Sequence, residues 1–382
     1  MRSITTEKLD HLLAELETKG IDLLLVNDSE MARTTHLQYL SGHPTDALLA
    51  ITQSGETCLM PADVPLAEEH AEVDHILDLI NFQYSAMNAL ADFVKKSVKT
   101  SSPVIGVLSN APFQLVLNLQ QYIPNCKIYQ KPREIGFELA QLRATKTPLE
   151  LDRLTDVAHL SNNLLKDIRR FAQNASDETE NDLAFYVMKR MRELGADENA
   201  FPSLVANTDR SYQLHCHPYA TNAPFNKPGL SIIDFGAKLN GYCSDITQPF
   251  AFGTISTEQQ KMIDVSLKAY DAVMNMIDID VPIHTIAETA RDILEGAGYP
   301  MNYGLGHGLG LEEHDAPFLF PKPTDPKRLE SWKEQRIQEG MVLAIEPGAY
   351  VKGEGGFRLE NDIMIRNGKV EMLTEARIEY IS

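Results

Sequence analysis

The segment from Ser231 to Phe250 constrains the fold most, because two apolar, β-prone runs flank the dipeptide Asn240-Gly241 within it. Both central residues of a type I′ turn need a positive φ, which Asn and Gly adopt more readily than other residues. We therefore expect two antiparallel strands that are joined at this dipeptide.

Asp234 and Asp245 lie one on each of these strands, and the hairpin puts them on the same face. A two-residue loop sets Asp245 opposite Gly236, with Asp234 one diagonal step away. A four-residue loop sets the two aspartates directly opposite one another. Like charges that face each other across a sheet are destabilising. Either one aspartate caps a turn while the other meets a lysine or arginine, or both hold a cation.

Length and charge limit the class of protein. A chain of 382 residues is long enough for two domains. Its 54 acidic against 35 basic residues give a net charge of −19, which argues against nucleic acid and anionic membrane surfaces as partners. The N-terminus has no apolar signal region, and the four cysteines are scattered without a CxxC pair. We expect a cytoplasmic protein with reduced thiols.

The N-terminal part alternates helical and strand patterns, which indicates an α/β domain. Thr6 is predicted to cap its first helix, and Ser54-Gly55 to join a second hairpin. Thr147-Pro148-Leu149-Glu150 is a capping box with Pro at the first helical position, so a new helix should begin there. We place the domain boundary close before it and expect an accessory domain at residues 1–140 and a larger domain at 141–382.

Three further places in the C-terminal part carry chemistry. His215 and His217 share a loop, where they could bind a metal or one of them could face a substrate. His307 stands among alternating glycines, which fit neither nucleotide-loop pattern but let backbone and ligand approach closely. Glu346 ends an apolar strand. Glu360 alternates with apolar residues in Phe357–Ile365, where it is either a solvated edge residue or part of a buried network with Arg358.

Four carboxylates and one imidazole suit divalent cations such as Mn²⁺, Co²⁺ or Zn²⁺. The charge balances if two such ions share the set. Two ions would lower the pKa of a bridging water and polarise a carbonyl, which predicts hydrolysis of an amide or related bond. No GxSxG motif or papain-like cysteine offers another nucleophile.

The five residues, in the order Asp, Asp, His, Glu, Glu, resemble those of the prolidase and aminopeptidase P group of dinuclear metallopeptidases. The phrases IIDFGAKLNGYCSDIT, GHGLGLEEHDAP, AIEPGAY and FRLEND are similar to the motifs of that family. The resemblance implies a C-terminal pita-bread domain behind a smaller α/β domain of the creatinase/prolidase type. It also implies hydrolysis of Xaa-Pro bonds in dipeptides or longer peptides by a hydroxide that bridges two metal ions, with Mn²⁺ preferred, and a homodimer.

The resemblance also implies a role for each matched residue. The metal ligands would be Asp234 and His307, one for each ion, together with Asp245, Glu346 and Glu360. In this scheme Asp245 and Glu360 bridge both ions, and Glu346 also relays a proton to the departing amine.

Three more residues are assigned to the substrate on the same grounds. His217 would contact it near the scissile bond, and His314 would help to stabilise the tetrahedral oxyanion. Arg358 is the third residue expected at the substrate.

The chain departs from the family pattern at Gln248, where an arginine is common, and at Leu230, where an acid is common. These departures leave open a hydrolase of a non-peptide amide or cyclic amidine on the same scaffold. A binding protein that has lost catalysis is the other alternative. The intact ligand set argues against both the metal-free creatinase branch and a binding protein, and the extra N-terminal domain argues against methionine aminopeptidase.

Overall fold

The computed structural model describes residues 2–330 and 332–382, so Met1 and Ser331 lie outside the described residues. The chain forms two compact units, which divide between Leu142 and Arg143. Each is described by itself below.

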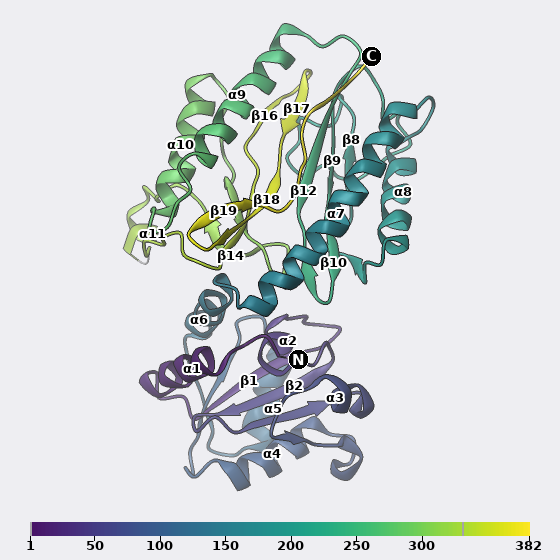
Figure 1. Ribbon diagram of the computed structural model, residues 1–382. Helices are drawn as coiled ribbons and strands as arrows, with labels where there is room; N and C mark the ends of the chain where they lie inside the picture. Colours follow the sequence, from purple (N-terminus) through teal and green to yellow (C-terminus); the bar gives the residue numbers. More distant parts are fainter. Residues whose placement is uncertain (1, 331) are drawn as a thin grey trace. The chain divides into compact units, whose positions relative to one another are not determined.

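The first unit contains a six-stranded mixed sheet, coloured purple to blue in Figure 1. Its strands, in spatial order, are β4 (His75–Ile76), β3 (Thr57–Pro61), β2 (Ala47–Thr52), β1 (Leu23–Asp28), β5 (Val104–Val107) and β6 (Lys127–Ile128). Strands β2 and β3 are antiparallel, which confirms the hairpin predicted at Ser54-Gly55.

The helices of this part of the chain are α1 (Thr6–Thr18), α2 (His36–Ser41), α3 (Val64–His70), α4 (Ala86–Ser97), α5 (Phe113–Tyr122) and α6 (Pro132–Ala144), with a short 3-10 helix at Leu79–Phe82. Alternate residues of β1, Leu23 and Leu25, pack in one core with Leu90 and Phe93 of α4. The predicted cap of α1 is wrong by one residue. Thr5 is extended and its side chain accepts from the backbone N–H of Lys8, whereas its neighbour is already helical.

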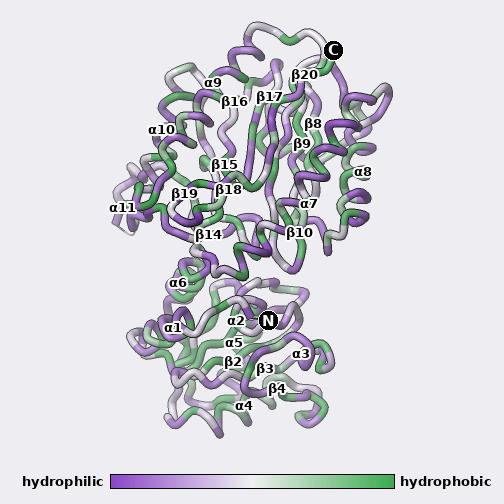
Figure 2. The backbone as a smooth tube through the Cα atoms, viewed as in Figure 1, coloured by the Kyte–Doolittle hydropathy of each residue, from purple (hydrophilic) through white to green (hydrophobic). Residues whose placement is uncertain are grey.

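In the second unit, the strands that carry the sequence motifs lie between two pairs of helices (Figure 1). One pair is α7 (Pro148–Asn174) and α8 (Glu180–Glu193), and the other is α9 (Thr257–Met274) and α10 (Ile283–Gly296). Hydrophobic residues follow the strands, and hydrophilic ones recur along the helices (Figure 2). The capping box that was predicted at Thr147 is present and opens α7. A further helix, α11, spans Pro326–Glu330. Among the described residues, no helix is long and apolar enough to cross a membrane.

Two sheets of this unit contain the predicted hairpin. They are β11-β10-β7 and β20-β12-β9-β8, formed by β7 (Glu198–Asn199), β8 (Leu204–Ala206), β9 (Gly229–Phe235), β10 (Ala237–Leu239), β11 (Tyr242–Cys243), β12 (Ile246–Phe252) and β20 (Glu379–Ile381). Leu239 pairs with Tyr242, and Asn240 and Gly241 both have positive φ. The two-residue loop is therefore confirmed and the four-residue alternative is excluded.

The other two sheets carry the later motifs. They are β14-β13-β15-β18-β19 and β16-β17, formed by β13 (Gly306–Gly308), β14 (Asp315–Leu319), β15 (Val342–Ile345), β16 (Gly348–Val351), β17 (Gly355–Arg358), β18 (Asn361–Arg366) and β19 (Lys369–Met372). The alternating run Phe357–Ile365 is interrupted after Arg358, because β17 pairs with β16 while β18 pairs with β15. Glu360 lies at this break.

Candidate metal centre and active site

Side chains from five separate segments of the second unit converge on one place. The predicted ligands, together with His314, fall into overlapping groups in each of which the donor atoms lie within 4.8 Å of one another. The groups are Asp234, Asp245 and Glu360, then His307, Glu346 and Glu360, then Asp245, His307 and His314. Each of the five predicted metal ligands belongs to at least one group. The structure therefore brings together residues that are more than a hundred positions apart in the chain.

Close backbone contacts place the first two aspartates. A Cβ on Gly236 would lie 2.2 Å from the carbonyl oxygen of Ser244, so the hairpin needs glycine where it bends. Beyond the bend Thr247 pairs with Asp234, and the register of the turn continues without a shift. Asp245 thus lies opposite Gly236, on the same face as Asp234.

The glycines around His307 serve the same purpose. A Cβ on Gly306 or Gly308 would lie 2.0 Å from a backbone carbonyl, that of Ala344 on β15 or that of Ala316 on β14. Strand β13 is therefore held tightly between its neighbours β14 and β15. This close packing fixes the direction of the His307 side chain.

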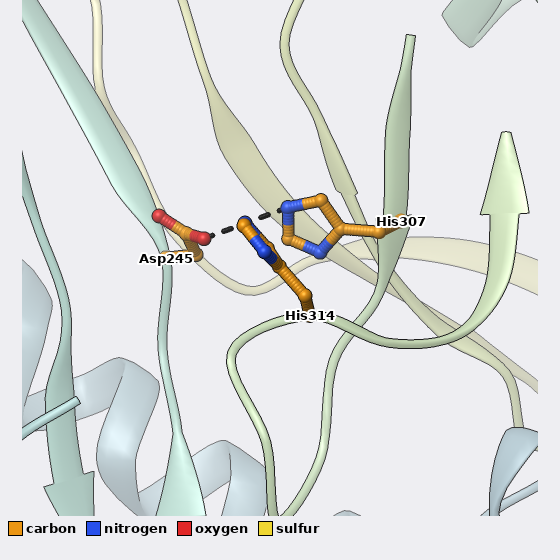
Figure 3. Close-up of side chains that lie close together, drawn as sticks. All are labelled: Asp245, His307 and His314. Carbon is orange, nitrogen blue, oxygen red and sulfur yellow. Dashed lines mark ion pairs between the residues drawn. The ribbon is translucent and has the colours of Figure 1, made fainter. Parts of the chain in front are cut away.

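The imidazole of His307 is arranged as a ligand. Its Nδ1 donates to the backbone carbonyl of Gly308 at 3.0 Å, so the lone pair is left on Nε2. That atom lies 3.6 Å from Asp245 and 3.8 Å from Glu346. Figure 3 shows Asp245, His307 and His314 pointing toward one another. Burial lowers the pKa of His307 to about 4, which favours the neutral form that binds metals.

The carboxylates of the cluster are largely buried, and each lies close to other negatively charged groups. Burial and then the charge of Glu360 raise the pKa of Asp245 well above its usual value, and burial and then Glu346 do the same for Glu360. Burial raises the pKa of Glu346 to about 7. Oδ1 of Asp234 is buried without a hydrogen-bond partner among the described residues. Divalent cations would relieve this repulsion and satisfy that oxygen, so the donor set fits them.

Arg358 is the cationic member of the cluster and is only 1% exposed. Its Nη2 donates to Asp234 at 2.6 Å, and its Nε to Thr247 at 2.8 Å. Its Nη1 donates to Tyr350 at 3.1 Å and to the carbonyl of Leu214 at 3.2 Å. For Phe357–Ile365 the alternatives were a solvated edge position for Glu360 or a buried network with Arg358, and the structure has the buried network.

The site opens into a cavity of about 380 Å³. Its wall contains all five predicted ligands together with Phe201, Pro202, Leu204, His215, Tyr219, Glu313, His314 and Arg358. His314 is exposed, and its ring lies 4.3 Å from that of His307.

The loop histidines occupy different positions. His215 lines the cavity, and burial followed by the charge of Arg358 lowers its pKa. His217 is exposed and meets the ring of Tyr219 edge-on, with 6.2 Å between the ring centres. Of the two histidines, His215 is among the residues that line the cavity.

The sequence pattern missed the wall residues Glu313 and Phe201, and one hydrogen-bond partner of Arg358, Tyr350. Glu313 was visible only as the second glutamate before His314, and Tyr350 as the end of AIEPGAY. Phe201 had no motif at all. Each of these residues can be assigned to the site only from its neighbours in the folded structure.

The atypical Gln248 is fully buried. Its Oε1 accepts from Nε of Arg169 on α7 at 3.0 Å, and its amide donates to the carbonyls of Pro249 and Arg377. A guanidinium thus reaches this position of β12 from helix α7.

In chain order, a smaller α/β unit precedes a larger unit with a carboxylate-rich centre whose donor atoms fit divalent metal ions. Residues 152–367 match metallopeptidase family M24, and residues 8–144 match the creatinase/prolidase N-terminal domain. The chain belongs to metallopeptidase family M24.

Similar proteins agree with this family. An uncharacterized peptidase of Staphylococcus haemolyticus is 30% identical over 63% of this chain and 65% of its own length. The Xaa-Pro dipeptidase of Pyrococcus horikoshii is 24% identical over 99% of both chains. The solved structure of an Xaa-Pro dipeptidase from Bacillus anthracis has a TM-score of 0.82 at 24% identity and covers 98% of this chain and 99% of its own. That last likeness shows the fold.

Proposed function

We propose that this metallopeptidase hydrolyses Xaa-Pro peptide bonds, with Asp234, Asp245, His307, Glu346 and Glu360 holding two divalent metal ions. The convergence of these five side chains in one cavity carries the proposal. The names of the Pyrococcus horikoshii and Bacillus anthracis relatives support the preference for proline.

The donor set suits oxygen-preferring cations, and Mn²⁺ is the proposed metal, with Co²⁺ and Zn²⁺ as alternatives. When bound, two such ions would supply an acidified water and a polarised scissile carbonyl. The protein holds its donors ready for them, because Arg358 fixes Asp234 and Thr247 donates to Glu360 at 2.7 Å.

Other side chains would handle the substrate and its protons. Glu346, whose side chain is 20% exposed, is more open to the cavity than Asp245 at 6%, so we assign proton transfer to the departing nitrogen to it. His314 would donate to the oxyanion. For the contact near the scissile bond we keep His217 as the residue that the motif indicates, with His215 as the one that lines the cavity. Arg358 would act on the substrate through Asp234 and Tyr350.

We also propose that the enzyme is a cytoplasmic homodimer with an accessory domain at residues 1–140. All four cysteines are free, which supports a reducing compartment. The match of residues 8–144 to the creatinase/prolidase N-terminal domain supports the accessory role. The dimer follows from the resemblance, and light scattering at several concentrations would test it.

The direct test is to assay the Mn²⁺-loaded protein on Ala-Pro-Ala and Ala-Ala-Ala, with Asp245→Asn as the matched inactive variant. We expect cleavage of the first peptide only, and loss of activity with a chelator. Equal cleavage of both peptides would remove the proline preference. If the protein binds stoichiometric metal and cleaves neither peptide nor Ala-Pro, the reading as a peptidase fails in favour of a non-peptide amide or a binding role.

A further inference from the structure

The cavity residues Glu313 and His314 lie in the chain between two acids that meet the same arginine. Nη2 of Arg143 forms an ion pair with Oδ2 of Asp315 at 3.0 Å, and its Nη1 lies 3.5 Å from Oε1 of Glu312. The side chains of Arg143 and Asp315 are only 2% and 4% exposed. The guanidinium therefore forms a buried bridge between the residues on either side of the two that line the cavity.

Asp315 is also held from other directions. A Cβ on Gly310 would lie 2.6 Å from Oδ2 of Asp315 and 3.3 Å from Cε of Lys146, so the carboxylate lies directly against the backbone of Gly310. Its Oδ1 accepts from the backbone N–H of Ala316 at 2.9 Å. Burial by itself would raise the pKa of Asp315, but the charges of Arg143 and Lys146 lower it below its usual value. Asp315 is therefore an ionised anchor with a fixed position.

The backbone that carries Arg143 is tied to the strands around His307. Arg143 lies in the last turn of α6, at the first position of the second unit. Two residues later, Thr145 forms an antiparallel bridge with Met341. Met341 leads directly into β15, whose residue Ala344 pairs with His307 on β13. The position of Arg143 relative to His307 is therefore set by backbone pairing and not by the loop that the arginine holds.

His314 has little packing of its own to hold it in place, because its side chain is exposed. Its ring centre nevertheless lies 4.3 Å from that of His307, and its donor atom lies within 4.8 Å of those of Asp245 and His307 (Figure 3). A group that stabilises a developing charge must lie at hydrogen-bond distance from it, and a misplacement of about 1 Å can cost roughly 100-fold in rate. The bridge at Arg143 supplies the constraint that the ring itself lacks.

We propose, on the basis of the proposed function, that Arg143 is a positioning residue, which holds the ring of His314 at the reacting carbonyl through its ion pairs with Glu312 and Asp315. Arg143 is not one of the described residues that line the cavity, so it acts through the loop and not on the substrate. A lysine would keep the charge, but its single ammonium cannot reproduce a contact that uses two separate nitrogens.

The test is a double-mutant cycle on the Mn²⁺-loaded enzyme with Ala-Pro-Ala as the substrate. Arg143→Lys should lower kcat by about 10- to 100-fold and change KM by less than about twofold, because the contact of His314 is made in the transition state. In the His314→Ala background the same substitution should lower kcat by less than about twofold. A loss of the same factor in both backgrounds would indicate a merely structural effect and overturn the inference, as would an unchanged kcat.

Arg190→Lys is the matched control, since Arg190 also pairs with two acids of the second unit, Asp167 at 2.7 Å and Glu193 at 3.0 Å. It should leave kcat unchanged. Asp315→Asn is the second variant if Arg143→Lys does not fold, because an amide oxygen can still accept from Ala316 while the charge is lost. It should show the same loss of kcat and the same dependence on His314.

A second measurement does not depend on the substrate. In the Zn²⁺-loaded protein with ¹³C-labelled histidine, the ring signal that His314→Ala removes should shift or broaden in Arg143→Lys and stay unchanged in Arg190→Lys. If this signal responds while the enzyme cleaves no Xaa-Pro peptide, the proposed function fails and the positioning of His314 by Arg143 stands. An unmoved signal in Arg143→Lys would contradict that positioning whatever the substrate.

Discussion

At the scale of single residues, Arg358 shows how a buried charge organises a metal centre. Its planar group contacts Asp234, Thr247 and Tyr350 at once, with an Nη2 to Asp234 distance of 2.6 Å. A lysine has one ammonium and cannot reproduce this fork. The position therefore depends on shape as well as on charge.

We expect Arg358→Lys to weaken metal binding or activity by about 10- to 100-fold, because partners of metal ligands typically have effects of this size. Metal titration and kcat/KM measure it. Arg366→Lys is the matched control, since Arg366 pairs with Glu371 at the surface and the expected change is below about 1 kcal/mol. Equal effects of the two variants would refute the organising role of Arg358.

The two histidines of the loop, His215 and His217, show what the spacing of residues in the sequence cannot decide. The motif pointed to His217, two positions from His215 in the same loop. Both have the same chemistry, and only the path of the loop decides that His215 lines the cavity. No local pattern carries that information, because the loop follows contacts with distant segments.

At the scale of elements, the hairpin from β9 to β12 was predictable in detail. Asn240-Gly241 set the turn, and the register that followed from it is the one observed. The bend at Gly236 was not predicted, since it depends on the carbonyl of Ser244 across the hairpin.

Gly236→Ala should therefore distort the hairpin and move both aspartates. A Cβ 2.2 Å from a backbone oxygen requires the strands to shift, and we expect destabilisation of about 1–3 kcal/mol with weaker metal binding. Urea unfolding and metal titration measure these changes. Gly296→Ala, at the end of α10, has no atom within 4 Å of the new Cβ and should be tolerated. A stable Gly236→Ala protein with normal metal affinity would contradict this account of the bend.

The loop that carries His215 and Tyr219 depends on the start of α8. Glu180 is fully buried, and its Oε2 accepts from the backbone and the hydroxyl of Thr221 at 2.9 and 2.6 Å. Its Oε1 accepts from the backbone N–H of Asn207 at 2.9 Å, and Arg210 forms an ion pair with it.

Glu180→Ala should destabilise the protein by about 3–5 kcal/mol, because it leaves Arg210 without its buried partner. In the folded fraction we expect a higher KM with metal stoichiometry retained, since the loop and not the ligand set is disturbed. Glu193→Ala on the same helix is exposed and serves as the control. A variant with unchanged KM would show that the loop holds its place without Glu180.

At the scale of the whole molecule, protons and metal ions compete for the same acids. The pKa values of Asp245, Glu360 and Glu346 in the folded, metal-free chain lie above those of the unfolded chain. The fold then binds more protons than the unfolded chain, so the contribution of these acids to stability falls as the pH rises from about 4 towards 7. His307, with its lowered pKa, acts in the opposite direction below about 6.5, but it is one group against three.

We expect Mn²⁺ to reverse this trend, since metal binding needs deprotonated carboxylates and releases protons. Saturation at 100 times the dissociation constant would add about 2.7 kcal/mol of stability. Urea unfolding at pH 5 to 8 with and without metal, and calorimetric titration in buffers of different ionisation enthalpy, measure the two effects. Asp245→Asn should show a smaller proton release. Stability unchanged by metal, or binding without proton release, would contradict the prediction.

The sequence by itself determined the family, the hairpin turn, the helix start at Thr147 and the identity of the five side chains that meet in the cavity. These depend on local backbone preferences and on motifs whose spacing is short. Only the tertiary structure decided that Phe357–Ile365 divides between two sheets, that His215 faces the cavity, and that Arg358 is engaged while Glu313 lines the wall. Such features depend on contacts between segments far apart in the chain, and no local pattern specifies them.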